Sequence, residues 1–103
     1  MKVDWSEPAV SDLDGIWDFI ARDSPHYATV TANRLTAAAR SLETFPRMGR
    51  HVPEAERQDV RELIVGSYRL MYRVEVERVL VVAVIHGRRD LGGLGEPWDP
   101  TQR

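Results

Sequence analysis

An unbroken apolar run, Val79–Ile85, is the feature that most constrains the fold of this chain. It is too short to span a bilayer as a helix, which takes about 20 residues. Its β-branched residues favour a strand. Because odd and even positions are both apolar, both faces of this strand must be covered, so we expect it in the interior of a sheet. The polar sequence His-Gly-Arg-Arg-Asp at 86–90 follows it and is not needed for folding.

Two strand-like segments precede this run. They span Val60–Val65 and Tyr68–Val76 and are rich in β-branched and aromatic residues. Gly66-Ser67 between them suits a two-residue type II′ turn, and Glu77-Arg78 is a weaker turn signal before the last strand. Residues 60–85 therefore predict three consecutive antiparallel strands.

Two-residue turns at both places would fix the register of these strands. Arg69 would then lie opposite Ile64 on one neighbour and opposite His86 on the other, and Arg73 would lie opposite Val82. One face of the sheet would be apolar and meet the helices, with Leu63, Val65, Tyr68, Leu70, Tyr72, Val79, Val81, Ala83 and Ile85. The other face would mix apolar and charged side chains, namely Ile64, Met71, Leu80, Val82, Val84, Glu62, Arg69, Arg73 and His86. We expect Leu91, Leu94 or Trp98 of the tail to cover part of this mixed face, and a partner chain to cover the rest.

The N-terminal half of the chain predicts one strand and two helices. Lys2–Trp5 alternates as a strand does, and Ser6 is a helix N-cap that opens a helix over 7–22. Ser24-Pro25 starts a second helix by the same rule, and Pro46 ends it. The short link between the helices predicts an antiparallel helix hairpin.

The order β-α-α-β-β-β is typical of an α+β fold. We expect the helix hairpin to pack on one face of a mainly antiparallel four-stranded sheet, with the first strand beside the last. Residues 46–59 form a long polar loop, and loops of this length are often functional or mobile. With 103 residues the chain is one domain, which we place at 1–91, followed by an irregular tail at 92–103.

Composition narrows the possible functions. The chain has no cysteine, which excludes disulfides and thiolate catalysis and fits a cytosolic protein. Its N-terminus has no apolar segment typical of a signal peptide. The formal net charge of −2 gives no overall attraction to nucleic acid. The three histidines, His26, His51 and His86, lack the spacing of metal ligands, and no glycine loop suits a phosphate cofactor, so we expect neither metal nor cofactor.

Basic side chains near the end of the sheet are the main chemical feature. Arg69, Arg73, Arg88, Arg89 and His86 could bind a phosphate, with arginines neutralising developing charge and the histidine acting as acid or base. In the alternative interpretation these residues are structural. Arg69 and Arg73 would then pair with Glu62 and Glu75, and His86 would cap the strand end.

Several short sequences, taken in order, resemble the RelE/ParE superfamily of bacterial toxins from type II toxin–antitoxin systems. They are Val-Asp-Trp-Ser-Glu-Pro-Ala at 3–9, Ser-Pro at 24–25, Phe-Pro-Arg-Met-Gly-Arg at 45–50, Arg-Glu-Leu-Ile-Val-Gly-Ser-Tyr-Arg-Leu-Met-Tyr-Arg-Val at 61–74 and His-Gly-Arg-Arg-Asp-Leu at 86–91. The resemblance implies the β-α-α-β-β-β fold and a cytoplasmic toxin that a cognate, ParD-like antitoxin holds inactive in a hetero-oligomeric complex.

The superfamily implies two mechanisms. RelE-like members cut mRNA on the ribosome with basic side chains, and here the resemblance assigns Arg69, His86 and Arg89 to catalysis. However, Arg61 is the best match on the preceding strand, where those nucleases have lysines, and the aromatic expected after Arg89 is missing. Trp98 is the nearest aromatic, and its indole cannot act as a tyrosine proton donor does.

ParE-like members inhibit DNA gyrase without catalytic residues of their own, and the His-Gly-Arg-Arg-Asp ending is similar to theirs. We therefore favour gyrase inhibition over mRNA cleavage, with a non-toxic interaction module as a further alternative. Under the favoured hypothesis the candidates for binding a target or antitoxin are Arg61, Arg69, Arg73, His86, Arg88, Arg89 and Trp98.

Overall fold

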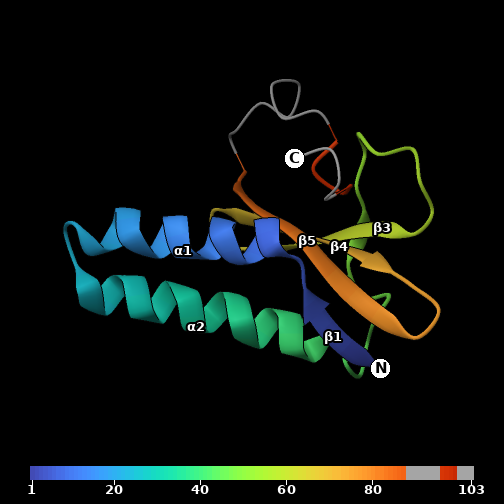
Figure 1. Ribbon diagram of the computed structural model, residues 1–103, viewed down its shortest axis with the longest axis horizontal. Helices are drawn as coiled ribbons and strands as arrows, with labels where there is room; N and C mark the ends of the chain where they lie inside the picture. The colour runs from blue at the N-terminus through green and yellow to red at the C-terminus, as the bar shows by residue number, and fades with distance from the viewer. Residues whose placement is uncertain (88–95, 100–103) are drawn as a thin grey trace.

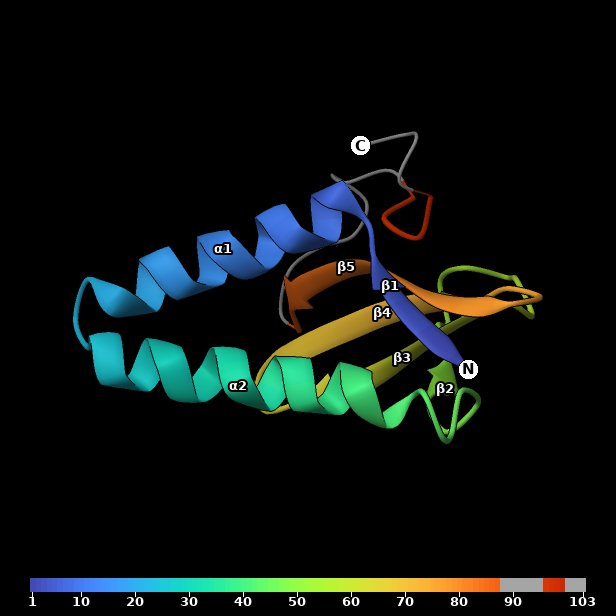
Figure 2. The same cartoon turned by 60° about the horizontal axis from the view of Figure 1, so that its bottom comes forward.

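The helix hairpin forms one layer of the molecule and the sheet forms the other (Figure 1). The computed structural model describes residues 1–87 and 96–99. Helix α1 spans Glu7–Ala21, and its N-cap Ser6 accepts a hydrogen bond from the Ala9 amide at 3.2 Å. Helix α2 spans Pro25–Ser41, with Ser24 as the N-cap. The two helices run antiparallel, as the short link predicts (Figures 1 and 2).

The sheet has five strands in the order β1-β5-β4-β3-β2. β1 (Lys2–Trp5) runs parallel to β5 (Arg78–His86), and the other pairs, formed with β4 (Tyr68–Val74) and β3 (Val60–Val65), are antiparallel. The α+β fold and the strand order are thus confirmed. The expected four strands become five because β2 (Arg50–His51), within the predicted loop 46–59, pairs with β3. A strand of two residues is too short to give a periodic signal.

The β3–β4 hairpin has the predicted register, with Val65 opposite Tyr68 and Ile64 opposite Arg69. Its turn begins at Gly66, whose φ of +59° is in the region that glycine tolerates best. A two-residue turn that begins with a positive φ is the expected kind for twisted antiparallel strands.

The predicted register of β4 against β5 is wrong. Val74 pairs with Val79, so the turn lies one residue earlier than expected, at Val76-Glu77. A β-bulge follows, because Tyr72 pairs with Val81 while Met71 pairs with Ala83. The extra residue in β5 shifts the remaining pairs.

The bulge changes which face several side chains occupy. Arg69, beyond the bulge, lies opposite Ile85 and not opposite His86. Arg73, between the turn and the bulge, lies opposite Leu80 and not opposite Val82 because the turn comes earlier. Beyond the bulge, Ala83 and Ile85 turn away from the helices, contrary to expectation. Val84 packs on the helix side instead.

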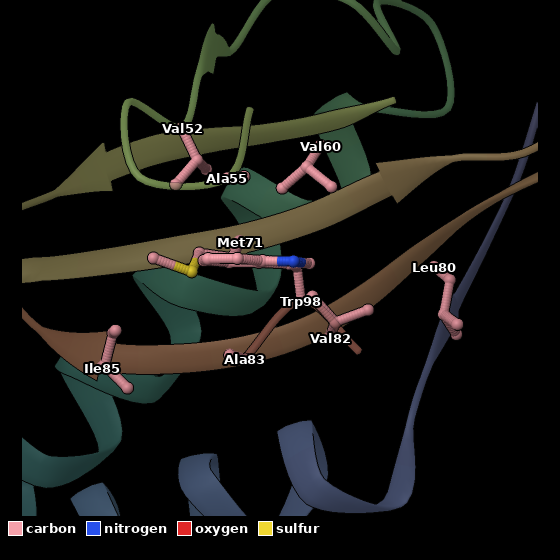
Figure 3. Packing of buried hydrophobic residues seen from close by; sticks show 9 residues of the cluster. All are labelled: Val52, Ala55, Val60, Met71, Leu80, Val82, Ala83, Ile85 and Trp98. Carbon is pink, nitrogen blue, oxygen red and sulfur yellow. The ribbon is translucent and has the colours of Figure 1, made fainter. Parts of the chain in front are cut away.

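Two buried clusters lie on the two faces of the sheet. The helix-side cluster consists of Ala9, Leu35, Ala39, Leu42, Leu70, Tyr72, Val79, Val81 and Val84. The far-side cluster consists of Val52, Ala55, Val60, Met71, Leu80, Val82, Ala83, Ile85 and Trp98 (Figure 3). Trp98, which is 5% exposed, packs in this cluster and confirms that a tail residue covers part of the mixed face. Leu91 and Leu94 lie outside the described residues.

Candidate functional site: the Arg69 groove

An open groove of about 600 Å³ lies where β3 and β4 meet the end of β5. Arg69 is one of the residues that line it, and we call it the Arg69 groove. Its walls include Arg50, Glu54, Ile64, Ser67, Arg69 and His86. These residues come from β2, the 52–56 loop, the β3–β4 hairpin and the end of β5. The groove therefore collects two of the residues that the sequence nominates, Arg69 and His86.

The Arg69 guanidinium is held by two carboxylates. Its Nε donates to Oε1 of Glu62 at 2.6 Å. Its Nη1 and Nη2 donate to Oε2 and Oε1 of Glu54 at 3.1 and 3.0 Å, a bidentate pair. The hydrogen bond from Arg69 lowers the pKa of the Glu54 carboxyl, and the hydrogen bonds to Glu54 and Glu62 raise the pKa of Arg69. Arg69 is only 8% exposed, so its positive charge is neutralised inside the protein.

Glu62 is the buried centre of this network. Its side chain has no exposed surface, and its second oxygen accepts a hydrogen bond from Nε of Arg50 at 2.8 Å. Arg50 itself is largely exposed at the rim of the groove. A buried carboxylate must be paired to avoid a large desolvation penalty, and Glu62 satisfies this with two arginines.

His86 lies at the end of β5 and borders the groove from the helix side of the sheet. It pairs with Tyr68 across the strands, and the two rings meet edge to face with centroids 5.6 Å apart. His86 also lines the space between the sheet end and Phe19 of α1. The bulge thus places the His86 and Arg69 side chains on opposite faces of the sheet, where the sequence predicts one common face.

The other nominated residues make structural contacts. Nη1 of Arg61 donates to the carbonyl oxygens of Arg47 and Gly49 at 3.0 and 2.7 Å, which holds residues 47–49 against β3. Arg73 pairs with Glu75 at 2.5 Å, at the other end of β4 from Arg69. The alternative in which Arg69 and Arg73 pair with Glu62 and Glu75 is therefore confirmed.

Some candidates are absent from the groove or from the described residues. Trp98 packs in the far-side cluster, which gives its ring a role in the core. Arg88 and Arg89 lie outside the described residues.

Within the described ranges, no group of three or more histidine or acidic side chains could hold a metal ion. No helix among them is long and apolar enough to cross a membrane.

Arg50 and Glu54 are the groove residues that sequence reasoning missed. Both lie in the polar stretch 46–59, where no periodicity marks them. Only the pairing of β2 with β3 brings Arg50 opposite Glu62. The contact between this stretch and the sheet depends on tertiary structure, and no local pattern in the sequence predicts it.

A comparison with solved structures supports the class of fold. The fold resembles a solved structure described as the chromosomal ParDE toxin–antitoxin system from P. aeruginosa. The TM-score is 0.70 with 21% identity, and the match covers 84% of this chain and 95% of that one. The likeness confirms the α+β fold that the sequence resemblance implies.

The family follows from the sequence match. The profile described as the ParE toxin of type II toxin–antitoxin systems, parDE, matches residues 3–91, so this chain belongs to the ParE toxin family. Toxin ParE3 of Caulobacter vibrioides is 28% identical over 87 residues, covering 84% of this chain and 86% of that toxin. Toxin RelE2 of the same organism is 35% identical over 88 residues, covering 85% and 97%.

Proposed function

We propose that this toxin inhibits DNA gyrase by binding to it, and that a cognate antitoxin neutralises the toxin in a hetero-oligomeric complex. Membership of the ParE family and the relative named ParE3 support the proposal. Action on gyrase implies a cytoplasmic location and requires no cofactor.

The neutralised state of Arg69 is the observation that favours binding over cleavage. A nuclease stabilises the charge that develops on the scissile phosphate, and it needs cationic donors aimed at that charge. Here each of the three nitrogens of the Arg69 guanidinium already donates a hydrogen bond to Glu54 or Glu62. A guanidinium paired with two carboxylates offers little net charge to a phosphate. The net charge of −2 is also unsuited to a nucleic-acid substrate.

A supercoiling assay with purified gyrase tests this function. Relaxed plasmid, ATP and gyrase are incubated with increasing toxin, and we expect the yield of supercoiled plasmid to fall. Topoisomerase I relaxation serves as the control and should be unaffected. Adding the antitoxin first should restore supercoiling. Full supercoiling at a large excess of folded toxin would contradict the proposal.

Ribosome-dependent mRNA cleavage is the second candidate, because Arg69 and His86 line one groove and one relative is named RelE2. In this mechanism Arg69, His86 and Arg89 act on the mRNA. Primer extension on translating mRNA would show new cleavage ends that vanish in Arg89→Ala. If expression without the antitoxin is harmless and neither assay responds, the chain is a non-toxic interaction module.

The binding surface of the toxin follows from the same proposal. We propose that residues of the 1–91 domain form it, with Arg61, Arg73, Arg88 and Arg89 as candidate contacts to gyrase or antitoxin. Alanine variants at these positions, assayed for gyrase inhibition and separately for antitoxin affinity, distinguish the two roles.

A further inference from the structure

In the Arg69 groove, a carboxylate of the chain itself occupies the position on Arg69 that a bound carboxylate would take. The Glu54 carboxylate meets the end of the Arg69 guanidinium in a bidentate pair, the geometry with which arginine binds carboxylates in other molecules. The two carboxylates on Arg69 differ in access. The Glu62 side chain is fully buried, whereas the Glu54 side chain is 43% exposed. Glu62 is therefore a fixed counter-ion, and Glu54 is the one that can be exchanged.

Glu54 extends from a loop and not from a strand. The loop is fastened by its apolar residues Val52 and Ala55, which pack in the far-side cluster, so Glu54 can leave Arg69 without unfolding the sheet. Glu56, two residues further on, has a φ of +50°, a conformation that is unfavourable for glutamate. Strained residues of this kind often accompany binding loops.

The wall of the groove beside Arg69 suits an extended segment. β2 begins opposite Glu62 and runs away from Ile64, so no described strand pairs with the edge of β3 at Ile64. The Ile64 side chain is 57% exposed and lines the groove together with Pro53. An open strand edge with an apolar contact is the surface to which extended peptides add.

The charges in the groove select the chemistry of the ligand. Arg50 and Arg69 balance Glu54 and Glu62, so displacement of Glu54 leaves one uncompensated positive charge. One charge, in a bidentate geometry, matches a single carboxylate. A nucleic acid would instead bring several phosphates to a site with a buried negative charge at its centre.

We propose that the Arg69 groove binds an extended acidic peptide segment of a partner protein. A carboxylate of that segment replaces Glu54 on Arg69, and a neighbouring apolar side chain packs on Ile64. The proposal goes beyond the proposed function, because it holds whether the toxin acts on gyrase or on the ribosome.

A gain of affinity tests this site. The probe is a fluorescein-labelled peptide of sequence Thr-Val-Glu-Val-Thr with blocked ends, and a matched peptide has Gln in place of its Glu. Glu54→Gln removes the internal competitor, so we expect this variant to bind the Glu peptide about tenfold more tightly than the parent toxin does, by fluorescence polarisation. Glu77→Gln is the control. It changes the net charge equally, and Glu77 makes no ion pair in the described part of the chain.

Because the expected result is tighter binding, an unfolded variant cannot imitate it. Amide chemical shifts of Ile64 and Arg69 in the Glu54→Gln variant should move when the Glu peptide is added. Equal affinity of Glu54→Gln and Glu77→Gln for the Glu peptide would overturn the proposal. So would equal binding of the Gln peptide, or binding of a single-stranded oligonucleotide in its place.

Discussion

Arg69 and Glu62 form a buried ion pair across β3 and β4, with Nε of Arg69 2.6 Å from Oε1 of Glu62. The two residues are diagonal neighbours, since Arg69 lies opposite Ile64 and Glu62 lies opposite Met71. The pair lies at the border of the far-side cluster. Removing one member of such a pair leaves a buried charge with fewer partners, which is far more costly than losing a pair at the surface.

The substitution Arg69→Met should therefore lower the free energy of unfolding by about 3 kcal/mol. It retains most of the apolar stem of the side chain but leaves Glu62 with Arg50 alone. Urea denaturation followed by circular dichroism measures the loss. Arg73→Met is the matched control, because Arg73 is on the same strand and its pair with Glu75 is more exposed. The control should lose about 1 kcal/mol or less. Equal losses in the two variants would contradict the special role of the buried pair.

Acid should weaken the fold through three carboxylates. Hydrogen bonds from arginines lower the pKa values of Glu54, Asp59 and Glu75. A carboxyl with a lowered pKa binds fewer protons in the folded state than in the unfolded state. Its contribution is complete above the usual glutamate value of 4.5 and is lost as the pH falls through the lowered pKa. Urea midpoints should thus be constant near neutral pH and decrease below about pH 4.5.

The variant Glu54→Gln isolates one of these groups. It should show a smaller decrease of the urea midpoint between neutral pH and pH 3 than the parent protein shows. The difference should be modest, because the partly exposed Glu54 side chain is screened by solvent. Glu77→Gln, which breaks no ion pair between described residues, should follow the parent curve. Parallel curves for all three proteins would show that the Glu54 pair has no influence on stability.

Local rules are sufficient to predict most of the fold. Serine caps and apolar periodicity locate both helices, and β-branched runs locate the long strands. The β-bulge between the pairings of Met71 and Tyr72 could not be predicted. In a strand that is apolar on both faces, the pattern has no alternation to mark an inserted residue. The assignment of Ala83, Ile85 and His86 to a face failed for that reason.

The candidate site was less predictable than the fold. Arg69 was found because side-chain alternation placed it on the mixed face of the sheet, and Glu62 was named with Glu75 as a partner for Arg69 and Arg73. Glu54 and Arg50 were missed, since a loop and a two-residue strand bring them to the site from a stretch without periodicity. Pairs between distant segments depend on tertiary structure and leave no local trace in the sequence.

Replacement of two glycines by alanine should change the stability of the protein in opposite directions. A Cβ at Gly49 would lie 2.6 Å from both the Glu62 carbonyl oxygen and the Tyr72 hydroxyl, and the Gly49 amide donates to that hydroxyl at 3.0 Å. Gly49→Ala should therefore destabilise the protein by about 1–3 kcal/mol. A Cβ at Gly15, within α1, meets nothing within 4 Å. Gly15→Ala should stabilise the protein by up to about 1 kcal/mol, the helix propensity difference.

Thermal denaturation of the two glycine variants and the parent protein checks both predictions. The melting temperature should fall for Gly49→Ala and rise for Gly15→Ala. A rise for Gly49→Ala would mean that residues 47–49 move freely and that the Tyr72 hydroxyl does not hold them.

Trp98 should be an essential part of the core although it lies in the tail. It is 5% exposed and packs with Met71 and Val82 on the face of the sheet that the helices do not cover (Figure 3). Trp98→Ala should lower the free energy of unfolding by about 3–5 kcal/mol, the usual cost of truncating a buried aromatic. Urea denaturation measures this loss. Trp17→Ala, at a position 38% exposed, should lose clearly less. If Trp98→Ala were as stable as Trp17→Ala, the tail would not cover this face in solution, and the far-side cluster would be open to a partner chain.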